Sequence, residues 1–244
     1  AYEIPKRDWS SDVCSSDLPV VDLKGVGVNL QDHMNVPVVY ERVVAGPFRD
    51  RMRFDRMAVN MIRAWLFGTG PATVLPGGLH GFLRTDPALS VPDLQFASRA
   101  VANDAHLWFP GIVKPYPDEL SMRPILLHPK SRGEVRLRSA DPLAKPRIVQ
   151  DFLGHPDDLP PLRRGIAIAR QIFAQKPLAR WVGKELQPGA SRTSEADIDQ
   201  HIRETTSTVS HPSCTCAMGA GEDAVVDLDL RLRGKRDTRC RSCR

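Results

Sequence analysis

The chain has 244 residues, of which 41% are hydrophobic and 26% are charged. This composition excludes a disordered or collagen-like protein, and the length allows one large domain or two smaller ones. No stretch approaches the roughly 18 to 20 apolar residues that a membrane-spanning helix needs. The N-terminal region also lacks a basic start followed by an apolar core. We therefore expect neither a transmembrane segment nor a secretory signal.

The formal net charge of +5 is concentrated at the C-terminus. Five basic residues there are accompanied by a single acidic one, Asp237; the basic ones are Lys235, Arg236, Arg239, Arg241 and Arg244. The rest of the chain is close to neutral. A basic tail can bind polyanions by releasing counterions. Because the charge is confined to the tail, we expect no nucleic acid as a partner.

The cysteines do not form a disulfide framework, because there are five of them and no spacing repeats. Cys240 and Cys243 make one half of a zinc pattern that has no second pair. We therefore expect no metal site. Reduced thiols and a cytoplasmic location are the corresponding expectations.

The first part of the chain changes character at Pro19. Residues 10–17 are a near-repeat of small polar residues, which is typical of a linker or of read-through sequence. Residues 20–27 then read as a short strand that enters a glycine-rich turn. From 51 to 67 the apolar residues recur at helical spacing, and Gly68 ends this predicted helix.

Short strands are predicted next, at 81–84, 94–97, 123–127 and 134–138, joined by proline-rich turns. A second amphipathic helix is predicted after Asp157 and ends at Lys176-Pro177. A short polar helix begins near Ser194 and runs to about Glu204. Strands followed by helices predict an α+β fold, in which an antiparallel sheet is backed by helices.

His211 is the most interesting of the seven histidines. It precedes Pro212, which favours an extended backbone, and an imidazole can accept a proton near neutral pH. A His-Pro pair is nevertheless more often structural, and the same holds for His128 before Pro129. The glycines of residues 25–30 lack the third glycine of a dinucleotide-binding turn, so that turn by itself predicts little.

Several segments occur in an order that carries a family resemblance. They read GVGVNLQDH at 25–33, GTGP at 68–71, GFLR at 81–84, HPKSRGEVRL at 128–137, HPSCTCAMG at 211–219 and AVVD at 224–227. In this order they resemble the C-terminal half of a glucose-methanol-choline (GMC) oxidoreductase, and the choline dehydrogenase-like members in particular. The resemblance covers about residues 19–234.

The resemblance implies a fragment of an FAD-dependent enzyme that oxidises a small alcohol. His211 matches the histidine that helps to remove the hydroxyl proton while hydride passes to the flavin. The residues implied in cofactor binding are Gly27, Asn29, Asp32 and His33. Residues 34–209 would form the substrate-binding domain, flanked at 19–33 and 210–234 by pieces of a Rossmann-like FAD-binding domain. The full-length parent would hold the FAD, and the electron acceptor stays open.

Three departures from the family shape the expectations. Residues 1–18 read as a foreign segment in place of family sequence. The glycine-rich FAD fingerprint of the family's N-terminal half is not found in this sequence. Residues 235–244 read as an aberrant basic tail, as a frameshift would produce, so a second catalytic residue is absent. Choline dehydrogenases have in common a glutamate near the position of Gly78, where it could meet a quaternary ammonium group. This chain has no charged residue at 76–79. We therefore do not expect choline as its substrate.

The chain by itself is expected to be inactive and to bind FAD weakly. The alternatives are a stand-alone binding module that uses the basic tail, or a non-catalytic fragment.

Overall fold

The computed structural model describes residues 23–73, 78–99, 101–102, 104–139, 141 and 143–234. The foreign segment predicted at 1–18 and the basic tail predicted at 235–244 both lie outside the described residues. The chain divides into two compact units. The larger unit comprises 32–131 and 152–211, and the smaller unit comprises 132–151 with the segments before 32 and after 211. The assignment of 19–33 and 210–234 to an FAD-binding domain stays a prediction.

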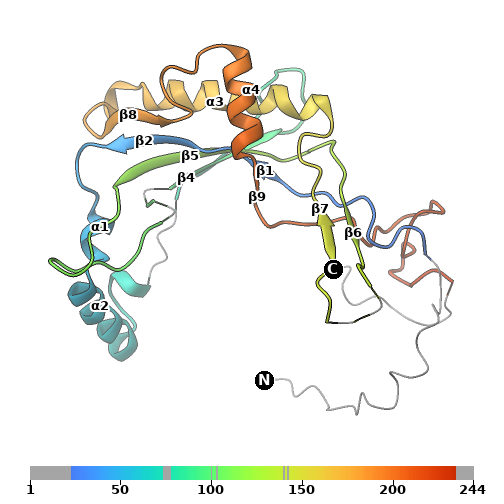
Figure 1. Cartoon of the computed structure of the whole chain (residues 1–244), viewed down its shortest axis with the longest axis horizontal. Helices are drawn as coiled ribbons and strands as arrows, with labels where there is room; N and C mark the ends of the chain where they lie inside the picture. The colour runs from blue at the N-terminus through green and yellow to red at the C-terminus, as the bar shows by residue number, and fades with distance from the viewer. Residues whose placement is uncertain are drawn as a thin grey trace. The chain divides into compact units, whose positions relative to one another are not determined.

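An antiparallel sheet forms the centre of the larger unit (Figure 1). Among the described residues seven strands belong to it: β1 (Met34–Asn35), β2 (Val38–Arg42), β3 (His80–Leu83), β4 (Leu94–Arg99), β5 (Glu119–Leu126), β8 (Val182–Gln187) and β9 (Ser207–Thr208). The order is β3-β4-β5-β1-β9, and β2 pairs with both β5 and β8. The sheet confirms the predicted α+β fold.

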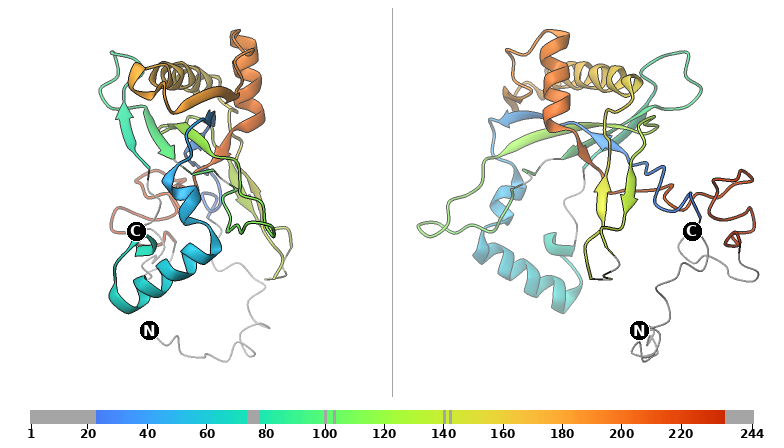
Figure 2. Two further views of the ribbon diagram at one scale, coloured as in Figure 1. Left: turned by 90° about the vertical axis from the view of Figure 1, so that its left-hand side faces the viewer. Right: turned by 45° about the vertical axis from the view of Figure 1, so that its right-hand side comes forward.

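Two helices, α3 (Leu159–Phe173) and α4 (Glu195–Thr205), cover one face of this sheet (Figures 1 and 2). The apolar stripe of α3 packs on alternate residues of the strands. The buried cluster contains Met34, Val36, Val38, Leu94, Phe96, Leu126, Leu159, Leu162, Ile166, Ala169, Phe173, Ile198 and Ile202. Burial of such a side chain stabilises the fold by roughly 1.5 to 3 kcal/mol. The helical spacing read from the sequence therefore marks the residues that hold α3 on the sheet.

Gly165 allows α3 to lie close to the strands. A Cβ atom at this position would fall 2.5 Å from Pro124 Cβ and 2.8 Å from Leu94 Cδ1. Any larger residue would push the helix away from β4 and β5. The helix approaches the sheet at the one residue type that leaves room for it.

The other helices are α1 (Pro47–Arg51) and α2 (Phe54–Phe67), and three 3-10 turns span Pro71–Thr73, Pro156–Asp158 and Lys176–Leu178. Both views of Figure 2 place α1 and α2 on the opposite side of the sheet from α3 and α4. The structure describes every residue of α2, and none of them is buried. The side chain of Trp65 is 85% exposed. The predicted helix is present, but its apolar stripe does not enter the core.

The smaller unit contains a two-stranded antiparallel sheet in its described residues, made of β6 (Glu134–Arg136) and β7 (Arg147–Val149). The sequence predicted that residues 134–138 join the main sheet, and this was wrong. The alternation of residues indicates a strand but does not specify its partner. Gly27 also belongs to this unit: a Cβ there would lie 2.2 Å from the Val135 carbonyl oxygen.

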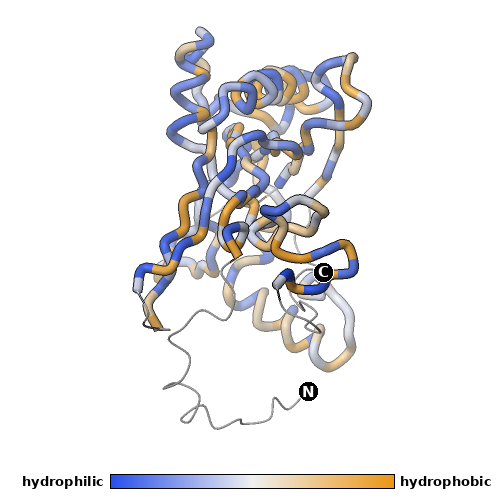
Figure 3. Tube along the Cα trace, turned by 90° about the vertical axis from the view of Figure 1, so that its right-hand side faces the viewer, coloured by the Kyte–Doolittle hydropathy of each residue, from blue (hydrophilic) through white to orange (hydrophobic). Residues whose placement is uncertain are grey.

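Hydrophobic and hydrophilic stretches are interleaved along the described part of the chain (Figure 3). None of the helices that the structure describes is long and apolar enough to cross a membrane.

Candidate active-site cleft

A cleft of about 710 Å³ lies on the sheet face that α3 and α4 leave open. Its floor is built by alternate residues of neighbouring strands. Ala97 of β4 stands opposite Arg123 of β5, and Ile125 of β5 stands opposite both Gln95 and Asn35. Residues directly opposite each other in an antiparallel sheet point to the same face. The polar side chains among them therefore gather in one place, at the end of which lies His211.

The backbone before His211 is held by a buried carboxylate. Asp32 is only 4% exposed. Its Oδ1 accepts a hydrogen bond of 2.9 Å from the His211 backbone N–H, and its Oδ2 accepts one from the Thr208 hydroxyl. Ser210, with a φ of 66°, makes the turn between them, and its N–H donates to Thr208 Oγ1 over 2.7 Å. Both oxygens of Asp32 are thus used to fix the segment that carries His211.

His33 lies beside His211. Their Nδ1 atoms are 3.4 Å apart, and the rings meet edge to face with centroids 5.5 Å apart. Burial lowers the pKa of His33 below its ordinary value, and the neighbouring His211 lowers it further. The carbonyl of Leu127 acts in the opposite direction as a hydrogen-bond acceptor. His33 is therefore neutral at pH 7, whereas the His211 side chain is exposed and its Nε2 has no partner among the described residues.

Asn35 connects this end of the cleft with Arg123. Its amide Nδ2 donates to the Ser207 carbonyl over 2.9 Å and to the Thr208 carbonyl over 3.3 Å. Its Oδ1 accepts a hydrogen bond of 3.4 Å from Arg123 Nη1. The Asn35 amide therefore uses both of its polar groups: its nitrogen donates to carbonyls of β9, and its oxygen accepts from Arg123 of β5.

The structure distributes the predicted site residues over both units. Asp32, His33 and His211 come together in the larger unit, where Asp32 serves the backbone of His211. Gly27 and Asn29 belong to the smaller unit, both with positive φ, at 79° and 61°. The Gly27 N–H donates to the Thr215 carbonyl and its carbonyl accepts from the Val135 N–H. Both polar groups of the Gly27 backbone are thus already paired inside this unit.

Sequence reasoning missed Asn35, Gln95, Arg99 and Arg123 as lining residues. A signal for Gln95 was present in β4, where Leu94 and Phe96 are buried and Gln95 between them is polar. That two-residue period marks one face for the core and the other for a site. Among the described residues, no group of three or more histidines, cysteines and carboxylates is arranged to hold a metal ion.

Position 78 also lines the cleft. A Cβ atom on Gly78 would fall 1.5 Å from the Ser98 carbonyl oxygen. The backbone of β4 therefore leaves no room for any side chain at position 78, a glutamate included.

Comparisons with known proteins agree with the resemblance seen in the sequence. Residues 129–240 match the family model described as GMC oxidoreductase. The oxygen-dependent choline dehydrogenase of Pseudomonas aeruginosa (strain LESB58) is 34% identical over 223 residues, which are 89% of this chain and 38% of that protein. The enzyme of the same name from Stenotrophomonas maltophilia (strain K279a) is 34% identical over 90% of this chain and 39% of its own length. The chain thus spans about two fifths of these curated relatives.

Solved structures of similar fold include pyridoxine 4-oxidase from Mesorbium loti, with a TM-score of 0.67 and 26% identity over 87% of this chain and 37% of that one. A formate oxidase from Aspergillus oryzae RIB40, in a study of FAD modification, has a TM-score of 0.70 and 23% identity over 88% of this chain and 42% of that one. An FAD-dependent oxidoreductase from Chaetomium thermophilum has a TM-score of 0.69 and 20% identity, over 89% and 43% of the two chains. These findings place the chain in the GMC oxidoreductase family, whose C-terminal domain it carries.

Proposed function

We propose that the whole protein to which this chain belongs oxidises the CH–OH group of a small alcohol with FAD as its cofactor, and that His211 accepts the hydroxyl proton. The single observation that carries this proposal is the placement of His211 at the end of the cleft, exposed and with a free Nε2. Bound FAD would supply the hydride acceptor. An imidazole free to take a proton beside a substrate cleft fits the requirements of that chemistry.

His33 determines which of the two ring nitrogens of His211 carries the hydrogen when the substrate binds. A hydrogen bond between two Nδ1 atoms requires a hydrogen on one of them. We propose that the neutral His33 ring directs the hydrogen of its Nε2 toward the Leu127 carbonyl, which leaves its Nδ1 as an acceptor. The shared hydrogen then lies on His211 Nδ1, and the lone pair lies on His211 Nε2. His211 is in this way prepared as a general base.

Asp32 acts as a positioning residue. It is buried, and it accepts hydrogen bonds from the Thr208 hydroxyl and the His211 N–H. Of the residues implied in cofactor binding, we propose that His33, which lies beside His211, contacts the FAD of the whole protein. The roles of Gly27 and Asn29 in cofactor binding stay predictions from the resemblance. Because both oxygens of Asp32 are engaged, we propose that it acts by holding the backbone of His211 in place.

Flavin reduction in the whole, FAD-loaded protein tests this proposal. The variant His211→Gln should slow the anaerobic reduction of flavin by roughly 100- to 10,000-fold, the usual contribution of a positioned base. Rates are normalised to bound flavin, so that a loss of cofactor is not counted as a loss of chemistry. His106→Gln, which changes an exposed histidine outside the cleft, is the matched control and should keep the original rate. A near-original rate for His211→Gln, with flavin bound, would contradict the proposal.

A further inference from the structure

We propose that the alcohol taken by this cleft carries a carboxylate, and that Arg123, assisted by Arg99, binds the carboxylate while the hydroxyl group lies at His211. This inference rests on the proposed function for the reaction at the hydroxyl group. The binding of an anion by the two arginines can be tested separately.

Arg123 is a half-buried cation that lacks a full set of partners. Its Nε is buried and makes no hydrogen bond in the described structure. The one hydrogen bond of its side chain within the described residues runs from Nη1 to Asn35 Oδ1 and is long, at 3.4 Å. Burial lowers the pKa of Arg123, and nearby Arg99 lowers it further. A buried donor without an acceptor is costly, and a carboxylate can accept from two guanidinium N–H groups at once.

The charges along the cleft have one sign. Arg99 and Arg123 are among its lining residues, and no aspartate or glutamate is among the lining residues that the structure describes. Asp32 lies behind His211 with both oxygens engaged. Charges of one sign in a cleft with walls of low dielectric constant concentrate ligands of the opposite sign. A quaternary ammonium would meet two arginines here without a carboxylate to balance them.

The order of the strands fixes the spacing between the two ends of the ligand. Arg123 lies on β5, Asn35 on β1 and Thr208 on β9, which are consecutive neighbours in the sheet. Neighbouring strands lie about 4.8 Å apart, so β5, which carries Arg123, and β9, which precedes His211, are roughly 10 Å apart across the floor. The cleft volume of about 710 Å³ is in the usual range for small ligands. A carboxylate and a hydroxymethyl group on opposite sides of a benzene ring match this separation.

The test uses the complete 244-residue chain and three probes of similar shape: 4-(hydroxymethyl)benzoate, neutral 4-methylbenzyl alcohol, and a benzyl alcohol with a trimethylammonium group in the para position. Binding is measured by titration calorimetry or by NMR at low ionic strength. We expect the carboxylate to bind at least tenfold more tightly than the neutral alcohol and the cation to bind most weakly. Equal binding of the three probes would overturn the proposal.

Variants of single arginines locate the effect. Arg123→Gln should remove most of the tenfold preference, and Arg99→Gln should reduce it. Arg203→Gln, which removes an exposed arginine on α4 outside the cleft, should leave it unchanged. Thermal melting checks that each variant is folded, and Arg99→Gln provides a second reading should Arg123→Gln unfold. A preference that survives both cleft variants would overturn the assignment.

Two further arms separate this inference from other outcomes. Inorganic phosphate should compete weakly; competition as strong as that of the carboxylate probe would overturn the substrate assignment and leave a general anion site. His211→Gln should keep the preference for the carboxylate, because the anion is bound at the arginines. If that variant keeps the preference and also reduces flavin at the original rate, the proposed function fails while the inference stands. If the preference is absent but His211→Gln blocks flavin reduction, only the inference fails.

Discussion

The two faces of the main sheet are made by the same strands, but one face packs in the core and the other lines the cleft. On one face, Leu94, Phe96 and Leu126 are buried beneath α3. On the other, Gln95 and Arg123 stand between those apolar positions and line an open cleft. Adjacent residues of one strand thus belong to the core and to the site in turn. Substitutions on one face should therefore change stability, and those on the other should change binding or chemistry.

The largest effect on stability is expected on the covered face. Leu162 of α3 is fully buried, so Leu162→Ala should lower the free energy of unfolding by about 3 to 5 kcal/mol, the upper part of the range for such truncations. Gln95→Ala on the cleft face is the matched control and should change it by less than about 0.5 kcal/mol. Urea denaturation measures both variants. Equal losses would show that the two faces are not distinct in this way.

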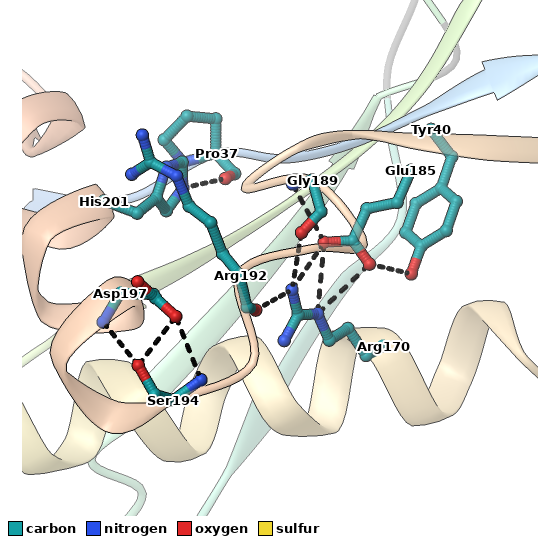
Figure 4. Close-up of polar contacts among 9 residues, drawn as sticks. All are labelled: Pro37, Tyr40, Arg170, Glu185, Gly189, Arg192, Ser194, Asp197 and His201. Carbon is teal, nitrogen blue, oxygen red and sulfur yellow. Dashed lines mark hydrogen bonds and ion pairs between the residues drawn. The ribbon is translucent and has the colours of Figure 1, made fainter.

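A polar network on the covered side should come next (Figure 4). Arg170 Nη2 donates to Glu185 Oε1 over 2.7 Å, and the Tyr40 hydroxyl donates to Glu185 Oε2 over 2.9 Å. Burial and Glu185 together raise the pKa of Tyr40 to about 12. Arg170→Ala would leave the Glu185 charge without its cation. Breaking a buried pair costs about 3 to 5 kcal/mol; because Arg170 is partly exposed, we expect about 2 to 3 kcal/mol.

The same denaturation experiment includes Arg192→Ala as the control. Arg192 pairs with Glu204 at the surface, and its loss should change the free energy of unfolding by at most about 1 kcal/mol. A similar loss for both variants would mean that burial does not strengthen the Arg170 network.

On the cleft face, Asp32→Ala should separate stability from chemistry. It removes the acceptor of the Thr208 hydroxyl and of the His211 N–H. Both groups lie near solvent and can find water, so the cost should be about 1 to 2 kcal/mol, at the lower end for lost acceptors. The rate of flavin reduction in the whole protein should fall by far more than this small loss of unfolding free energy would explain. Asp32→Asn retains one acceptor and should rescue part of the rate; no difference between the two variants would exclude the positioning role.

The smallest effect concerns pH. Burial lowers the pKa of His201 below its ordinary value of 6.5, and its Nε2 donates to the Pro37 carbonyl over 3.0 Å. The folded protein therefore keeps this histidine neutral below pH 6.5, while the unfolded chain takes up a proton. Its contribution to stability is complete above pH 6.5 and is lost as the pH falls further.

His201→Gln, which keeps a donor for Pro37, should therefore lose less stability than the original protein between pH 7 and pH 5. Melting temperatures measured across this range test the expectation. Parallel curves for the two proteins would assign the acid sensitivity to other groups.

Much of the covered face could be predicted from the sequence, because helical and strand periods are local. The stripe of α3 and the start of a helix near Ser194 were predicted and are present; the Ser194 side chain caps this helix by accepting from the Asp197 N–H. Strands β2 and β8 were missed. They pair with each other, and β2 also pairs with β5, across long stretches of chain. No residue of β8 is buried, so the strand lacks a clear alternation.

The cleft was predictable only in part. His211, His33 and Asp32 stood in motifs that resemble a family, whereas Asn35 and Arg123 stood in none. Asn35 meets Arg123 across 88 residues and Ser207 across 172. Contacts of that range depend on strand order, which no local pattern contains. The roles proposed for Gly27, Asn29 and the other site residues stay predictions, as does the inactivity of the isolated chain.

The close approach of Gly78 to Ser98 limits how the cleft could be redesigned for a cationic alcohol. A negative charge cannot enter at position 78, because the Ser98 carbonyl occupies the place of the first side-chain atom. Asn35 is a poor site as well, since a carboxylate there would face the carbonyls that its amide now binds. Within the described residues the Gln95 side chain hydrogen-bonds only to the exposed His80, and it differs from glutamate by a single group of similar size. An engineer seeking to reverse the charge preference would begin with Gln95→Glu.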